Sequence, residues 1–338
     1  MVSPSIKFIF CSILVGLVAC SKDYSPRLSN EIVVIPDGFP AMDFPADNAF
    51  SPTRWQLGKA LFYDTRLSKD SSVSCGSCHN PQLAFSENKK LSRGFDNRIG
   101  TRNAPTLANV GYHPYFTRDG GVPSLEMQVL VPIQEHNEFN FNIIDIGERL
   151  KDDAYYDSLS QLAYSRGLDY YVLVRAIATF ERSLISGNSA VDEYRIGGDY
   201  SRLTNTEIAG MNLFYSDRTN CSVCHAGVQY SDFSFQNNGL YQTYKDLGRY
   251  RLTGDSADIA LFKVPTLRNV GVTAPYMHDG SFTTLEEVVN HYSEGGVSHR
   301  NKSHLIKPLG LTNRERHQLI AFLNALTDYQ FLTNKKLK

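Results

Sequence analysis

The chain has 338 residues, of which 42% are hydrophobic and 12% aromatic, so it is long enough for two domains with buried cores. Its 34 basic and 35 acidic residues nearly cancel. This balance gives no support for binding to nucleic acid or to an acidic membrane surface.

The N-terminus has the composition of a targeting segment. Lys7 precedes the apolar run FIFCSILVGLVA, which is shorter than a normal membrane-spanning helix, and Cys20 follows it. The sequence LVAC at this point is similar to a bacterial lipobox, in which the cysteine becomes the lipid-bearing N-terminus. We predict a lipoprotein signal peptide over residues 1–20, the alternative being a plain signal peptide, and a tether over residues 21–50. The mature protein would then be exported, in the periplasm or cell envelope, and held at a membrane only through its lipid.

Helical periodicity dominates the rest of the chain, and strand alternation is scarce. The helical stretches are 53–63, 124–134, 145–165, 169–186, 205–216, 284–292 and 313–327. Capping boxes start three of them, and these pair Thr204 with Glu207, Thr284 with Glu287 and Thr312 with Glu315. The pattern predicts an all-α fold. Residues 187–203 interrupt it, which suggests domains over 51–190 and 191–338.

Two C-x-x-C-H sequences, CGSCH and CSVCH, carry the strongest chemical signal. Their residues are Cys75, Cys78, His79, Cys221, Cys224 and His225. Two thiols at this spacing can bond to the vinyl groups of a haem, and the adjacent histidine can ligate its iron. A zinc site would need the two motifs to meet, and a redox dithiol would need a βαβ setting. We therefore predict two covalently bound haem c groups, with His79 and His225 as iron ligands.

A repeat follows the two motifs at an offset of 160 residues. Residues 105–126 align without gaps to residues 265–286, with ten of 22 positions identical. This predicts two related haem domains in tandem, with one iron each.

The helix expected over 284–292 bears on the iron ligand of the second haem. Leu285, Val288, Val289 and Tyr292 form one apolar stripe, and His291 falls outside it. The stripe directs Tyr292 toward the core, where a haem would lie. The alternatives are a core tyrosine with a hydrogen-bonded hydroxyl, Met277 as the ligand, or His291.

Longer motifs surround the two attachment sequences. They are LGKALFYDTRLS, SCGSCHNPQLAFS, RNAPTLANV, SLEMQVLVPI, CSVCHAG, FKVPTLRNVGVTAPYMHDG and LEEVVNHY. With them, the chain from about Leu57 to Asp328 resembles the bacterial di-haem cytochrome c peroxidase and MauG family. The resemblance implies two all-α cytochrome c-like haem domains in tandem, with a peroxidatic N-terminal haem and an electron-transfer C-terminal haem.

The resemblance also implies site residues. It assigns Gln128 and Glu138 to the peroxide pocket, and Tyr292 to the axial position of the second haem, where classical peroxidases have Met and MauG has Tyr. A carboxylate near an open iron face can move a proton between the peroxide oxygens, which suits Glu138. The alternative is a surface glutamate in a polar loop, with Glu135 and His136 as nearby rivals.

An interdomain calcium site is implied as well, on Asn103 and on the backbone carbonyls of Thr273 and Pro275. Calcium takes oxygen ligands of this kind. A homodimer is compatible with the resemblance.

Two departures from the family pattern are visible. Phe95 stands where classical members have a distal histidine just before RNAPT, so we expect the first haem to be open, with His113 as the remaining candidate ligand. Arg118 stands where the family usually has an interhaem tryptophan, and the only tryptophan is Trp55. Arg118 could pair with a haem propionate or be solvated.

The function that these features predict is reduction of hydrogen peroxide to water with electrons from a small redox protein or other external donor. The alternatives are MauG-like oxidation of a protein or small molecule, and a non-catalytic di-haem electron carrier.

Overall fold

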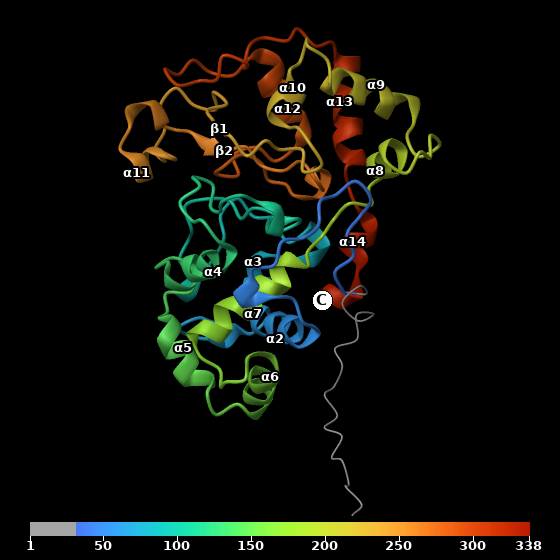
Figure 1. Ribbon diagram of the computed structural model, residues 1–338. Helices are drawn as coiled ribbons and strands as arrows, with labels where there is room; N and C mark the ends of the chain where they lie inside the picture. Colours follow the sequence, from blue (N-terminus) through green and yellow to red (C-terminus); the bar gives the residue numbers. More distant parts are fainter. Residues whose placement is uncertain (1–31) are drawn as a thin grey trace, which may run out of the picture.

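The structure, a computed structural model, describes residues 32–338, so the predicted leader and its Cys20 lie outside the described residues. The described part is helix-rich with little sheet (Figure 1). Its α-helices are α2 Pro52–Phe62, α3 Cys75–Cys78, α4 Leu125–Gln134, α5 Ile143–Leu150, α6 Ala154–Tyr164, α7 Tyr170–Arg182, α8 Ala190–Arg195, α9 Asn205–Phe214, α10 Cys221–Cys224, α11 Tyr250–Thr253, α12 Leu285–Glu294, α13 Asn313–Ala325 and α14 Tyr329–Thr333. The strands β1 Phe235–Gln236 and β2 Phe262–Lys263 form one short antiparallel pair.

The three capping boxes expected from the sequence are formed at the starts of α9, α12 and α13. The stretch 145–165 differs from the expectation, because it is two helices rather than one. Asp153 accepts hydrogen bonds from the backbone N–H groups of Tyr155 and Tyr156, which starts α6 anew after the turn that ends α5. A further capping box, between Ser189 and Asp192, starts α8 inside the stretch that interrupts the helical periodicity.

The two largest hydrophobic clusters form the cores of the two halves of the molecule. In Figure 1 the helices α2 to α7 occupy the lower half and α8 to α13 the upper half. In each half one helix pair crosses closely at a glycine. A Cβ on Gly58 of α2 would lie 1.8 Å from the carbonyl oxygen of Ala176 in α7, and a Cβ on Gly210 of α9 would lie 1.9 Å from that of Gln318 in α13. Any larger residue there would force these helices apart.

The described part of the predicted tether, residues 32–50, packs along the body. Asn48 is fully buried and donates to Glu126 at 2.8 Å and to the carbonyl of Arg175 at 3.0 Å in the lower half. Phe39 lies under the guanidinium of Arg268 in the upper half, 4.6 Å from the ring centre. This segment therefore contacts both halves.

The final residues return to the lower half. Phe331, Leu332 and Leu337 belong to its hydrophobic cluster, and the hydroxyl of Tyr63 donates to the carbonyl of Leu337 at 2.6 Å. Figure 1 shows α14 beside the lower half and below α13, with the C-terminus at the end of the chain beneath it.

Between the halves, the chain is held by buried polar groups. Asp328 accepts from the hydroxyl of Ser186 at 3.1 Å and from the N–H of Gly187 at 2.9 Å. Asn109 and Asn269 also bond to Ser186, one from each copy of the sequence repeat. All of these groups find partners, as buried polar groups must.

Among residues 32–338, no helix combines the length and the apolar character needed to cross a membrane.

Candidate functional site

The first C-x-x-C-H motif forms a single helical turn, α3, with Ser74 and Ser77 capping its start. The chain then leaves the turn at His79, whose backbone N–H still donates to the carbonyl of Cys75 at 2.9 Å. The imidazole Nδ1 lies 2.8 Å from the carbonyl oxygen of Phe85. A proton on Nδ1 makes this contact a hydrogen bond and leaves Nε2 with a free lone pair, which is the form that ligates a metal.

The second motif repeats this geometry. It forms the turn α10, and the N–H of His225 donates to the carbonyl of Cys221 at 2.9 Å. The Nδ1 of His225 lies 2.9 Å from the carbonyl of Tyr230. Burial lowers the pKa of both His79 and His225, which keeps the imidazoles neutral and able to bind iron.

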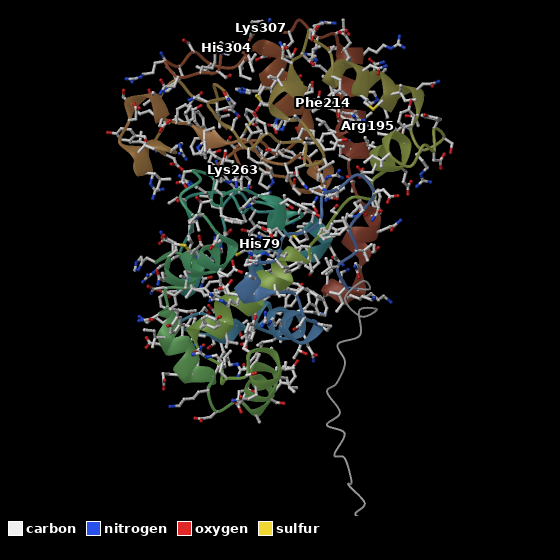
Figure 2. All side chains as sticks on the ribbon, in the orientation of Figure 1. His79, Arg195, Phe214, Lys263, His304 and Lys307 are labelled. Atoms are coloured by element: carbon white, nitrogen blue, oxygen red, sulfur yellow. The ribbon has the colours of Figure 1, made fainter. Side chains whose placement is uncertain are left out.

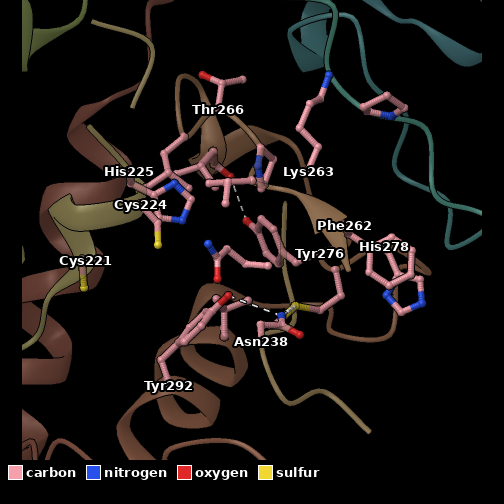
Figure 3. Close-up of a pocket in the computed structure, with 18 of the residues that line it drawn as sticks. Cys221, Cys224, His225, Asn238, Phe262, Lys263, Thr266, Tyr276, His278 and Tyr292 are labelled. Carbon is pink, nitrogen blue, oxygen red and sulfur yellow. Dashed lines mark hydrogen bonds between the residues drawn. The ribbon is translucent and has the colours of Figure 1, made fainter. Parts of the chain in front are cut away.

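A cavity of about 380 Å³ opens in front of the second motif. Cys221, Cys224 and His225 line one side of it, and most of its remaining wall is apolar. Figure 3 shows Tyr292 on the side of this cavity opposite His225, with the two cysteines at its edge. An apolar pocket with a neutral histidine on one side suits a flat, largely apolar cofactor.

The donor set fits a c-type haem better than the alternatives. All four motif cysteines are free rather than joined as disulfides. Over the part of the chain that the structure describes, no three His, Cys, Asp or Glu side chains come together to hold a metal ion, so the motifs do not combine into a zinc site. A haem would bring to each motif the vinyl groups and the iron for which the thiols and the imidazole are placed.

Two residues could face the iron of the second haem from the far side. The side-chain amide of Asn238 lies 3.4 Å from the hydroxyl of Tyr292 and 3.3 Å from the sulfur of Met277, so the two lie close together. Both line the cavity. Burial raises the pKa of Tyr292, so the hydroxyl keeps its proton unless a metal ion displaces it. His291 does not line the cavity, and its Nε2 lies 3.0 Å from the carbonyl of Asn238.

Glu138 lies near the first motif. Its carboxylate is close enough to Cys75 and Cys78 to raise the pKa of both thiols, although burial is the larger cause for each. Burial, followed by the neighbouring charge of Glu135, raises the pKa of Glu138 to about 7. The backbone N–H of Phe95 donates to the carbonyl of Glu138 at 2.6 Å, so these two residues are neighbours.

Gln128 lies on α4 and lines the cavity, and its Oε1 is buried without a hydrogen-bond donor. No measured contact joins Gln128 to Glu138, which lies outside this cavity. An orphaned amide oxygen of this kind is free to orient a bound molecule.

Two cations, Lys263 and Arg118, and one imidazole, His113, lie where the two halves join. Figure 2 places Lys263 at this junction, and its Nζ donates to the carbonyl of Tyr115 at 2.8 Å and lies 3.5 Å from Nδ1 of His113. Arg118 also lines the cavity, and its guanidinium donates to Asn103. Burial lowers the pKa of Lys263 to about 8 and of Arg118 to about 10. Both cations face a cavity that could receive carboxylates, such as those of a haem.

The three residues of the predicted calcium site, Asn103, Thr273 and Pro275, all belong to the wall of one cavity. The N–H of Asn103 donates to the carbonyl of His278 at 3.0 Å, which links the two halves at this point.

Three residues near these sites are not among those predicted from the sequence. Asn238 contacts both iron-ligand candidates, and no motif marks it. Lys263 lies within the quoted motif FKVPTLRNV, which could have marked it. Glu181 is 8% exposed, lies close enough to Cys75 to raise the pKa of that thiol, and has its own pKa raised to about 8 by burial. It follows Phe180 in the core stripe of α7, so only tertiary packing shows its position.

Comparison with known proteins agrees with this geometry. The family model described as "Di-haem cytochrome c peroxidase" matches residues 52–201. The chain is 36% identical to "Methylamine utilization protein MauG" of Methylorubrum extorquens, over 83% of this chain and 80% of that protein. It is 34% identical to "Cytochrome-c peroxidase IdrP1" of Pseudomonas sp. strain SCT, over 85% of this chain and 84% of that protein.

A solved structure is also similar. The crystal structure of "a MauG-like protein associated with microbial copper homeostasis" matches with a TM-score of 0.86 and 33% identity, covering 90% of this chain and 98% of that chain. These relatives match most of both chains at more than 30% identity, and we conclude that the chain belongs to the di-haem cytochrome c peroxidase family of oxidoreductases.

Proposed function

We propose that the protein is an exported di-haem c-type peroxidase, which reduces hydrogen peroxide to two water molecules with two electrons from an external donor and two protons. Haem iron, when bound at His79, supplies the site at which peroxide binds and is reduced. The same proposal includes two haem domains in tandem, a lipid on Cys20 and a location in the cell envelope. They are supported by the sequence repeat and by the lipobox-like LVAC.

The observation that carries the proposal is the pairing of Phe95 with Glu138. The backbone hydrogen bond between them makes the two residues neighbours, and the Phe95 ring, which cannot ligate iron, packs against the cations of Lys69 and Arg98. We propose that the peroxide pocket at the first motif has Glu138 as its proton-transfer group and no histidine on the far side of the iron. A pure electron carrier needs neither feature.

Within this pocket, the chain's own groups have separate tasks. Glu138 takes a proton from bound peroxide on its carboxylate and returns it to the departing oxygen. The family resemblance assigns the orienting of peroxide to Gln128, whose amide oxygen has no hydrogen-bond donor and lines the cavity that reaches the second motif. The buried pair of His79 and the Phe85 carbonyl holds the imidazole ring in place.

At the second motif we propose that Tyr292 is the iron ligand opposite His225, with Met277 as the alternative. Both line the same cavity as His225, whereas the ring nitrogen of His291 is engaged with Asn238. A phenolate ligand favours oxidised iron and lowers the reduction potential, whereas a methionine raises it.

The position of Tyr292 also favours a second function, which is MauG-like oxidation of a protein or small molecule. Tyr292 at the cavity, together with Phe95 in place of a distal histidine, suits an enzyme that stores an oxidising equivalent. Arg118 in place of the usual tryptophan counts against an aromatic route for charge between the haems.

The test of the proposed function is peroxide turnover. The haem-loaded protein should oxidise a reduced small cytochrome when hydrogen peroxide is added, with two donor molecules consumed per peroxide. A protein that exchanges electrons with the cytochrome but leaves peroxide unreacted would be an electron carrier, and the proposal would fail.

Covalent haem attachment gives a prediction of its own. Denatured wild-type protein should retain two haems per chain by mass and by its pyridine haemochrome spectrum. The double variant Cys221→Ala and Cys224→Ala should retain one, because only the first motif keeps its thiols. Retention of two haems by that variant would contradict the assignment of the second motif.

The ligand assignment predicts a spectroscopic change. Tyr292→Phe removes the phenolic oxygen while keeping the ring, so the low-spin EPR signal of the second haem should be replaced or shifted. Met277→Leu serves as the matched control and should leave that signal unchanged. The opposite pattern would make Met277 the ligand.

A further inference from the structure

Asn103, the side-chain ligand that the sequence assigns to calcium, already has a cationic partner for its oxygens. Asn103 is 5% exposed. Its backbone carbonyl accepts from Nη2 of Arg118 at 2.8 Å and from Nε at 3.2 Å, and its side-chain Oδ1 accepts from Nη2 at 3.2 Å. The guanidinium therefore lies against both oxygen atoms that Asn103 could offer to a metal ion.

The remaining polar groups of Asn103 are also engaged. Its side-chain Nδ2 donates to the carbonyl of Lys89 at 3.0 Å, and its backbone N–H donates to the carbonyl of His278. Asn103 thus has a complete set of partners, and rotation of its amide toward a metal would break several of them.

The nearby carboxylates are committed elsewhere. Asp246 binds Arg102 through two contacts of 2.6 and 3.0 Å, and Asp119 binds the same guanidinium at 2.9 Å. Asp279 accepts from the hydroxyl of Tyr241 at 2.7 Å and from the N–H of Ser281. Calcium binds six to eight oxygens and favours carboxylates among them. Neither Asn103 nor these carboxylates offer a free oxygen, so the side chains at this place do not fit a calcium ion.

We propose that the guanidinium of Arg118 replaces calcium as the fixed cation at the junction of the two halves, and that this chain binds no calcium at Asn103. A divalent ion at these oxygens would lie directly against a permanent positive charge and would be repelled. A guanidinium is permanently charged, weakly hydrated and planar, and it can bond to two oxygens at once.

Arg118 makes a second contact at this junction, through its backbone. Its carbonyl accepts from the N–H of Lys263 in β2 at 2.7 Å, and Asn103 is bonded to His278. Arg118 therefore connects the lower half to β2 through its backbone and to the Asn103–His278 link through its side chain. Arginine at the position where the family usually has tryptophan therefore puts a guanidinium cation in the place of an aromatic ring.

The experiment uses the full haem-loaded protein. Calcium content is measured by mass spectrometry of the metal, and the melting temperature is measured with a chelator and with added calcium chloride. The wild type should hold less than one calcium per chain and melt at the same temperature under both conditions. A stoichiometric calcium ion, removed by chelator with a fall in melting temperature, would overturn the proposal.

Arg118→Gln tests the guanidinium itself. This variant should melt at a lower temperature than the wild type, and calcium should recover part of the loss. Arg249→Gln is the matched control, because Arg249 lies at the same junction but donates to the carbonyl of Asp119 and not to Asn103. It should show no response to calcium. If Arg118→Gln keeps the wild-type melting temperature and haem EPR spectrum, the guanidinium holds nothing together and the proposal is wrong.

These readouts are independent of peroxide turnover. Loss of the proposed peroxidase function would leave them unchanged, and the absence of calcium would not alter the roles proposed for Glu138 and Tyr292.

Discussion

Glu138→Gln should lower the turnover of hydrogen peroxide by about 10²- to 10⁴-fold, because an amide of the same size cannot take up the peroxide proton. The rate of the wild-type enzyme should also depend on the ionisation of this carboxylate, and therefore on pH. The pKa of Glu138 is raised to about 7, and only the ionised carboxylate can act as a base. The second-order rate with peroxide should therefore rise as pH increases through about 7 and level off above it. Stopped-flow mixing with peroxide across this pH range measures both effects.

Glu135→Gln is the matched control for this prediction. Glu135 is exposed and contributes a like charge that helps to raise the pKa of Glu138. Its removal should keep most of the turnover and should move the rise in rate to lower pH. Wild-type activity in Glu138→Gln, or a pH profile that is unchanged in Glu135→Gln, would count against the pocket assignment.

Arg268→Met should reduce the free energy of unfolding by about 3–5 kcal/mol, because it leaves Asp192 as an unpaired charge in the core. The side chains of Arg268 and Asp192 are 1% and 7% exposed, and two contacts of 2.8 and 2.9 Å join them. Urea unfolding of the haem-loaded protein, followed in the far-UV, measures the loss.

The double variant Arg268→Met with Asp192→Asn separates charge from packing. It removes both charges, so it should recover part of the stability lost in the single variant. Arg54→Met is a control for loss of a guanidinium outside the buried core, with an expected loss of about 1 kcal/mol or less. A loss below about 1 kcal/mol in Arg268→Met would show that Asp192 reaches water or another cation.

Local signals in the sequence predicted local structure well. The C-x-x-C-H spacing gives a helical turn followed by a fixed histidine, and the Thr–Glu capping boxes start helices where they occur. The break at Asp153 was missed because apolar periodicity continues across it. The side chain of Asp153 nevertheless caps the next helix, so a stricter search for N-caps could have found the break.

Contacts between distant segments could not be predicted in this way. Asn238 contacts Tyr292 and Met277 from a loop that lies 54 and 39 residues before them in the chain, and no periodicity marks that loop. The sequence predicts that Arg118 pairs with a haem propionate or is solvated. Its hydrogen bonds to Asn103 depend on how two loops fold against each other, which local propensity does not describe.

The return of α14 to the lower half bears on how the chain reaches its folded state. Leu337 and Phe331 complete a core whose first helix begins at Pro52, nearly the whole described chain away. Such distant contacts form late, because the entropy of closing so long a loop must be overcome first. Under the proposed export, the N-terminal half would therefore expose an incomplete core until the last residues of the chain arrive. The proposed covalent attachment of haem at Cys75 and Cys78 would then meet a half whose core lacks its C-terminal residues.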